Sequence, residues 1–146
     1  MDYLIQLLMA YLGSLGFGGL YNLHGRKLQF AAVGGFLAWG VYLLINQLTP
    51  SPYPCAFVSS VALTLYSELM ARVRRCPVTG YLQVALLPLV PGAGIYRAMA
   101  YCVEGDTAMF SETLLHTIGF AAALSVGAML ASSVVRALLP RFPRKK

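Results

Sequence analysis

Residues 81–103 read YLQVALLPLVPGAGIYRAMAYCV, an apolar stretch long enough to cross a membrane. Two prolines and two glycines fall within seven residues near its centre. Each proline removes a backbone donor and clashes with the preceding turn of a helix, and Pro91 also drives Val90 towards an extended conformation. The stretch therefore predicts a membrane-spanning helix broken at Pro88, Pro91 and Gly92, with a second half-helix that starts at Pro91.

The rest of the chain also has the composition of an integral membrane protein. Of its 146 residues, 58% are hydrophobic and 11% are charged, whereas soluble domains have about 25% charged residues. Five membrane helices of about 20 residues each would use roughly 100 residues. The remainder forms short loops, which excludes a soluble nucleotide-binding or catalytic domain within this stretch.

The lengths of the apolar runs predict five membrane-spanning helices, because every backbone polar group in lipid has to form a hydrogen bond within a helix. The spans cover residues 3–23, 30–48, 55–71, 81–103 and 113–137. Residues 49–54 contain three prolines and predict a tight, non-helical connection. The predicted fold is an all-α bundle that forms a single transmembrane domain over residues 1–146 and ends in a basic tail at 138–146.

The charges predict an orientation. Basic residues follow the first and third spans and fill the tail, whereas the fourth connection carries only the acids Glu104, Asp106 and Glu112. The positive-inside rule then predicts a multi-pass inner-membrane protein with its N-terminus outside and its C-terminus in the cytoplasm. This distribution accounts for the net charge of +6 without a nucleic-acid-binding patch. The tail either anchors the topology or binds anionic lipid headgroups.

The fifth predicted span carries four small residues at four-residue spacing, Gly119, Ala123, Gly127 and Ala131. They share one helix face and allow another backbone to approach closely. This face is either a moving or homo-oligomeric interface, or a static contact within the chain.

The broken span also predicts a binding site. The N–H groups of Gly92, Ala93 and Gly94 would be free at the start of the second half-helix, where the helix dipole is positive. Half-helices of this kind bind substrate carboxylates in secondary transporters. The alternative is a proline kink whose free backbone groups bond to neighbouring side chains and water.

The stretch from Leu87 to Tyr96, LPLVPGAGIY, resembles the proline–glycine–tyrosine motif of the threonine/serine exporter (ThrE-like) family. The resemblance extends to ELMAR at 68–72, CPVT at 76–79, Gly105-Asp106 and the Gly/Ala-rich last span. It covers roughly the last 80 to 90 residues, and the first two spans only by hydropathy. The length of the chain is similar to that of the small membrane subunit in the split, two-component members of the family.

The resemblance implies that the chain pairs with a larger membrane subunit to export threonine and serine, or dicarboxylates such as succinate. It places Pro91, Gly92 and Tyr96 at the substrate site. The Tyr96 hydroxyl then either reaches the substrate or belongs to a ring that fills a gap.

Two ionisable side chains lie inside apolar runs, Arg97 and Glu68. Arg97 either pairs with a substrate carboxylate, extends to the headgroups, or pairs with Glu104. Glu68 precedes Arg72 by four residues, which is the favourable order for a helix ion pair. Alternatively, it is a proton-coupling carboxylate.

No catalytic motif, metal-ligand spacing or cofactor-binding motif is present, so the sequence predicts a transporter rather than an enzyme. The predicted function is a subunit of a secondary exporter of small carboxylate-bearing metabolites. A non-transporting scaffold for a larger membrane partner and an oligomeric metabolite channel are the alternatives.

Overall fold

The computed structural model describes residues 2–49, 51–75 and 77–138. Pro50 of the predicted connection, Cys76 of the quoted motif and the predicted tail beyond Leu138 lie outside the described residues. Within the described ranges all regular secondary structure is helical.

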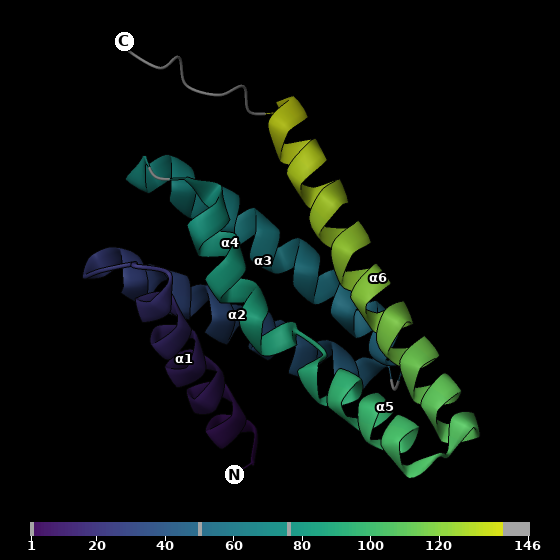
Figure 1. Cartoon of the computed structure of the whole chain (residues 1–146). Coiled ribbons are helices and arrows are strands. Elements are labelled where there is room, and N and C mark those ends of the chain that lie inside the picture. Colours follow the sequence, from purple (N-terminus) through teal and green to yellow (C-terminus); the bar gives the residue numbers. More distant parts are fainter. Residues whose placement is uncertain (1, 50, 76, 139–146) are drawn as a thin grey trace.

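Figure 1 shows the helices in chain order. They are α1 (Asp2–Leu20), α2 (Arg26–Leu48), α3 (Pro52–Arg74), α4 (Val78–Leu86), the short 3₁₀ helix η1 (Leu87–Leu89), α5 (Gly92–Glu104) and α6 (Thr107–Leu138). By length and apolar composition, α1, α2, α3 and α6 can each cross a membrane, and α4–η1 with α5 makes a fifth span if the bent pair is one span. The predicted all-α membrane fold is confirmed.

The break in the fourth span is also confirmed, with one difference at its edge. The axes of α4–η1 and α5 meet at 53°. Val90 is extended, with φ −62° and ψ 126°, as expected before a proline. Pro91 has a non-helical ψ of 51° and is the residue before the helix, so α5 starts at Gly92 rather than at Pro91.

The prediction that residues 49–54 form a non-helical connection is wrong for its second half. Helix α3 begins at Pro52, and Pro54 lies in its first turn. The N–H groups of a first turn have no partner within the helix, so prolines cost little there.

Helix α6 begins at Thr107, well before residue 113, where the apolar run starts. Gly105 ends α5 in a left-handed conformation with φ 81°. The Asp106 carboxylate then accepts a hydrogen bond from the Met109 N–H at 3.0 Å, which caps the start of α6. Glu112, assigned to a loop by hydropathy, therefore lies on a helix.

Helix α3 is the centre of the bundle and packs against α2, α4 and α6. Its buried face is largely polar, with Ser59, Ser60, Thr64, Ser67 and Glu68. Ser60 and Thr64 satisfy their hydroxyls on their own helix, by donating to the carbonyls of Phe57 at 2.8 Å and of Ser60 at 2.7 Å. These short side chains leave little bulk between α3 and its neighbours.

The small residues of α6 face α3 within the same chain. A Cβ at Gly127 would lie 2.7 Å from the Phe57 carbonyl oxygen, and one at Gly119 would lie 2.9 Å from the Tyr53 ring. Ala131 is buried, and Ala123 packs against the hydrophobic core. The small-residue face therefore lets α3 and α6, the most extensively packed pair of helices, come into close contact.

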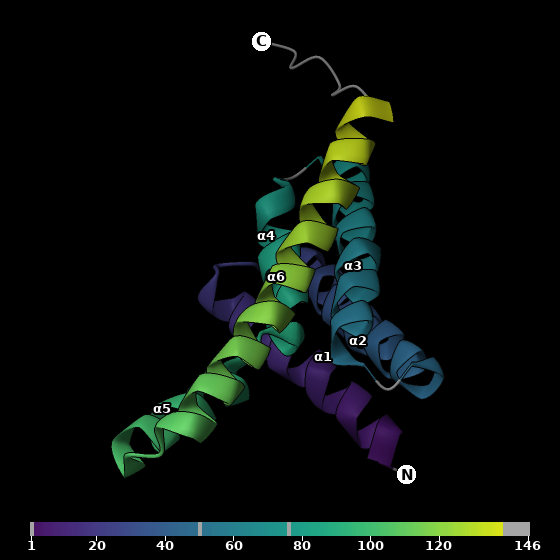
Figure 2. The same ribbon diagram turned by 90° about the vertical axis from the view of Figure 1, so that its right-hand side faces the viewer.

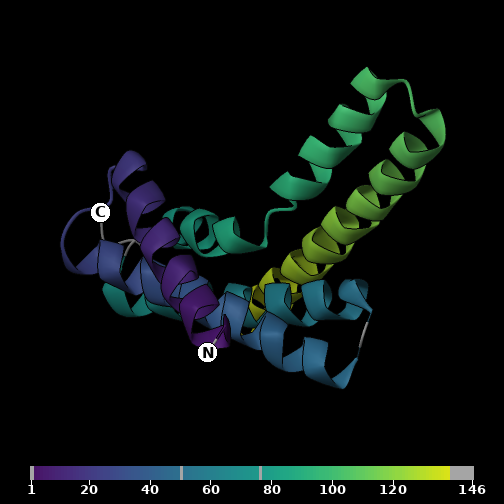
Figure 3. The same ribbon diagram turned by 90° about the horizontal axis from the view of Figure 1, so that it is seen from below.

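Helix α5 packs chiefly against α6. Figures 2 and 3 show α5 and the first half of α6 projecting as a hairpin from the bundle of α1 to α4. The 53° bend turns α5 away from α4 and so leaves room between the hairpin and α2. The candidate site lies there.

Candidate functional site

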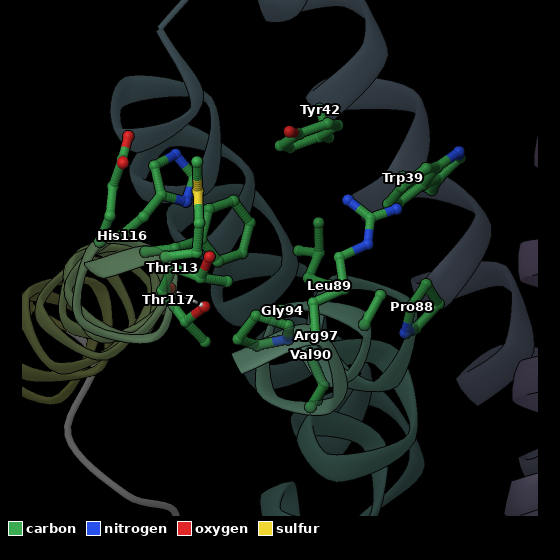
Figure 4. A pocket seen from close by; sticks show the side chains of 15 residues that line it. Trp39, Tyr42, Pro88, Leu89, Val90, Gly94, Arg97, Thr113, His116 and Thr117 are labelled. Atoms are coloured by element: carbon green, nitrogen blue, oxygen red, sulfur yellow. Dashed lines mark hydrogen bonds between the residues drawn. The ribbon is translucent and has the colours of Figure 1, made fainter. Parts of the chain in front are cut away.

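A cavity of about 680 Å³ lies at the break in the fourth span, between α2, η1, α5 and α6 (Figure 4). All four residues of the segment from Pro88 to Pro91 line it. Residues far apart in the sequence meet here because α6 returns alongside α5 and α2 approaches η1.

Helix α5 contributes Ala93, Gly94 and Arg97 to the cavity. Gly92 and Tyr96 do not line it, although the sequence assigned both to the substrate site. Tyr96 is 76% exposed, because one face of a short helix can point into the cavity and Tyr96 lies on another. Of the five residues predicted for the substrate site on this segment, three therefore line the cavity: Pro91, Ala93 and Gly94.

The start of α5 supplies fewer free backbone donors than expected. The Gly92 N–H donates to the Val90 carbonyl at 2.8 Å, so it is not free, contrary to the prediction. Ile95 donates to the Pro91 carbonyl at 3.2 Å. No side chain caps this helix, and the N–H groups of Ala93 and Gly94 have no partner within the described part of the chain. Two donors therefore remain at the cavity.

The cavity contains side chains of opposite charge, Arg97 on α5 and Glu112 on α6. Figure 4 shows the Arg97 side chain pointing towards Trp39 on α2. Across the described residues, no ion pair joins Arg97 to Glu104, which was one alternative for its role. Arg97 is an exposed residue, and a guanidinium can bind an anion.

Helix α6 contributes two pairs of polar side chains, each pair one turn apart. Glu112 and His116 form the first pair, and Thr113 and Thr117 form the second. The His116 ring lies 5.3 Å from the Tyr53 ring between centroids. Glu112 was missed as a site residue because the predicted span began one residue after it. The sequence signal that could have found it is Asp106, a helix-capping residue just before Thr107.

Aromatic residues form the wall on the α2 side. The rings of Trp39 and Tyr42 stack at 5.2 Å with an interplanar angle of 18°. Tyr42 also meets Phe120 of α6 edge-on at 6.2 Å. Stacked aromatic rings in a cavity can attract a cationic group through their faces. Sequence reasoning missed these residues too, since aromatic side chains in apolar spans carry no distinguishing pattern.

Glu68 lies outside this cavity, in the C-terminal half of α3. It is 5% exposed, and its carboxylate accepts a hydrogen bond from Arg72 Nη1 at 2.9 Å. Arg72 also donates to the Glu68 carbonyl at 3.1 Å. The local ion pair between these two residues is therefore present in the fold, and Glu68 does not meet Arg97.

The sequence profile of the family described as Threonine/Serine exporter, ThrE, matches residues 6–134. The chain belongs to the threonine/serine exporter family. The match spans α2 to α5 and most of α1 and α6. It thus extends the motif resemblance over the first two helices, where hydropathy was the only likeness. No solved structure matches the chain.

Membership of this family supports a role in membrane transport, in agreement with the apolar helices. The cavity at the break offers a guanidinium, a carboxylate, two backbone donors and an aromatic wall. This set of groups is suited to a small polar molecule that carries charges of both signs.

Proposed function

We propose that this chain is a subunit of a secondary amino-acid exporter and that the cavity at the break holds the substrate during transport. One observation carries the proposal: Arg97 and Glu112, of opposite charge, come from two facing helices and line one cavity. A neutral amino acid such as threonine or serine carries the complementary pair of charges.

In this proposal, the substrate carboxylate binds at the α5 side. The Arg97 guanidinium can form two parallel hydrogen bonds with a carboxylate. The N–H groups of Ala93 and Gly94 add donors at the positive end of the half-helix.

The substrate ammonium binds at the α6 and α2 side. Glu112 provides the negative charge, and the face of Tyr42 provides cation–π attraction. The Thr113 hydroxyl lines the same wall and can bond to the hydroxyl of threonine or serine.

A dicarboxylate is the second candidate substrate, from the family resemblance. Its second carboxylate would lie towards Glu112, and two like charges in a cavity of low polarity repel each other. The charge pair therefore favours a zwitterion over a dicarboxylate such as succinate.

The test is export of labelled threonine, serine and succinate from cells that produce the wild type, Arg97→Gln or Glu112→Gln. Arg97→Gln should reduce export of all three solutes at least tenfold. Glu112→Gln should reduce export of the two amino acids about tenfold and leave succinate export unchanged or higher. Tyr96→Phe is the matched control, since Tyr96 points away from the cavity. Unchanged threonine export in Glu112→Gln would overturn the assignment.

The subunit arrangement is part of the proposal. The resemblance to split exporters supports a larger membrane partner. The exposed apolar faces of α1, α5 and α6 form a surface that this partner, a second copy of the chain or lipid can contact. If Arg97→Gln abolishes export while the partner keeps its abundance, a purely scaffolding role is excluded. An oligomeric channel would instead show non-concentrative flux from the purified chain in liposomes.

The orientation follows from the basic connections, which support an outer N-terminus and a cytoplasmic C-terminus in the inner membrane. The α5–α6 hairpin then lies in the outer half of the membrane. Labelling of single cysteines introduced at Gly25 and Gly105, both in exposed turns, by an impermeant reagent in intact cells tests this: only Gly105→Cys should react.

A further inference from the structure

A second cavity, of about 280 Å³, lies at the opposite end of α4 from the break. The turn between α1 and α2 forms one side, through Tyr21, Leu23 and Lys27. The first turns of α4 form the other side, through Thr79, Tyr81 and Gln83. The cavity therefore shares no lining residue with the site at the break.

This end of the bundle is strongly basic. The start of α2 carries Arg26 and Lys27, and α3 ends with basic residues that include Arg74. The two segments lie together, since the Arg74 guanidinium is 4.2 Å from the centroid of the Phe30 ring on α2. Glu68, the acidic residue nearest in sequence on α3, is paired with Arg72. The surroundings of the cavity are complementary to an anion.

The lining is also amphipathic. Leu23 packs on the first turn of α4, where a Cβ at Gly80 would lie 3.5 Å from its Cδ2. Lys27, Thr79 and Gln83 add a cation and neutral hydrogen-bonding groups to this apolar base. Beside the cavity, α1 ends with Leu20, which is 80% exposed, so an apolar surface continues from it along the helix.

We propose that this cavity binds the phosphate headgroup of an anionic membrane phospholipid. Lys27 supplies the point charge for the phosphate, and Thr79 and Gln83 supply hydrogen bonds to its oxygens. The acyl chains lie along the exposed apolar side chains at the end of α1. A lipid fits better than a soluble anion, because the polar and apolar linings are joined at the end of membrane-spanning helices.

The experiment measures binding of phosphatidylglycerol to the purified full chain in phosphatidylcholine nanodiscs, by native mass spectrometry and by the midpoint of thermal unfolding. The expected result is one tightly held phosphatidylglycerol and a higher midpoint. Lys27→Gln should weaken the binding about tenfold or more, because it removes a charge-assisted hydrogen bond to the phosphate. Arg26→Gln is the matched control, since Arg26 is adjacent to Lys27 and does not line the cavity, and it should weaken binding less than twofold.

Three results would overturn the proposal. Equal weakening by Arg26→Gln and Lys27→Gln would mean general attraction to a basic surface. Equal stabilisation by inorganic phosphate would mean a soluble-anion site. Displacement of the lipid by threonine or serine would place the cavity on the path of the exported solute. If Lys27→Gln does not fold, Thr79→Val keeps the side-chain shape, removes one hydrogen bond and should still weaken lipid binding.

Discussion

Gly94 of α5 lies so close to Thr117 of α6 that a Cβ on Gly94 would be 2.5 Å from Thr117 Oγ1. That hydroxyl donates to the Thr113 carbonyl at 2.7 Å, which holds it in place. The absence of a side chain at Gly94 thus sets how closely α5 packs against α6. Through this packing, Arg97 and Glu112 come to share one cavity.

We expect Gly94→Ala to lower the free energy of unfolding by about 1–3 kcal/mol, the usual cost of overpacking. Thr117→Ala removes the opposing atoms, so the double variant Gly94→Ala/Thr117→Ala should recover most of the loss. Thermal unfolding in detergent measures both. Gly92→Ala is the control, because no atom outside its own helix lies within 4 Å of the added Cβ. Equal stability of Gly94→Ala and the wild type would contradict the contact.

Gly127→Ala should disrupt the packing of α6 on α3. Its Cβ would meet the Ser60 hydroxyl and would lie 2.7 Å from the Phe57 carbonyl oxygen, which cannot rotate away. We expect a loss of about 1–3 kcal/mol that Ser60→Ala does not restore, because the backbone clash remains. Gly13→Ala, in open space on α1, should be neutral or stabilise by up to about 1 kcal/mol. Unfolding by SDS in mixed micelles compares the variants.

Arg72→Leu should be more destabilising than Glu68→Gln. It leaves a buried carboxylate without its cation, which costs about 3–5 kcal/mol in a fully buried pair and less here, because the Arg72 side chain is 20% exposed. Adding Glu68→Gln to Arg72→Leu should recover part of the loss. If the double variant is less stable than Arg72→Leu alone, the burial of an unpaired carboxylate is not the cause of the loss in stability.

The same Glu68→Gln variant distinguishes a structural role from proton coupling. For a structural ion pair, export per molecule should stay at the wild-type level at every external pH. Loss of pH-gradient-driven export, with exchange of labelled for unlabelled threonine retained, would instead identify Glu68 as a coupling carboxylate.

Tyr66→Phe should weaken the contact between α2 and α3. The Tyr66 hydroxyl donates to the Phe30 carbonyl at 2.8 Å, and loss of such a bond costs about 0.5–1.5 kcal/mol. Tyr96→Phe removes a hydroxyl from an exposed ring and should leave stability unchanged. The two midpoints of thermal unfolding, measured side by side, provide the check. A stability loss in Tyr96→Phe would mean that its hydroxyl has a partner in the assembled exporter.

The break at Pro91 could be predicted because its cause is local. A proline fixes its own φ, restricts the residue before it and removes a backbone donor, whatever surrounds it. The same rule failed at Pro52, because the cost of a proline depends on its position in the helix and disappears in the first turn.

The site could be predicted only in part. Reasoning from the motif placed the substrate at the start of α5, and Ala93 and Gly94 do line the cavity there. It could not show that Tyr96 points away, since α6 decides which face of α5 is covered. Glu112 was missed because hydropathy marks where an apolar run begins and not where a helix begins.

The membrane class, the all-helical bundle and the broken span could all be predicted from the sequence. These follow from composition and from backbone hydrogen bonding in lipid, both of which are properties of a short stretch of chain. The packing of the helices brings Trp39, Arg97 and Glu112 around one cavity and places Lys27 and Thr79 in the lining of another, and no sequence pattern predicts either grouping. Such groupings depend on which helix faces meet, and close contacts such as that of Gly94 with Thr117 fix those faces.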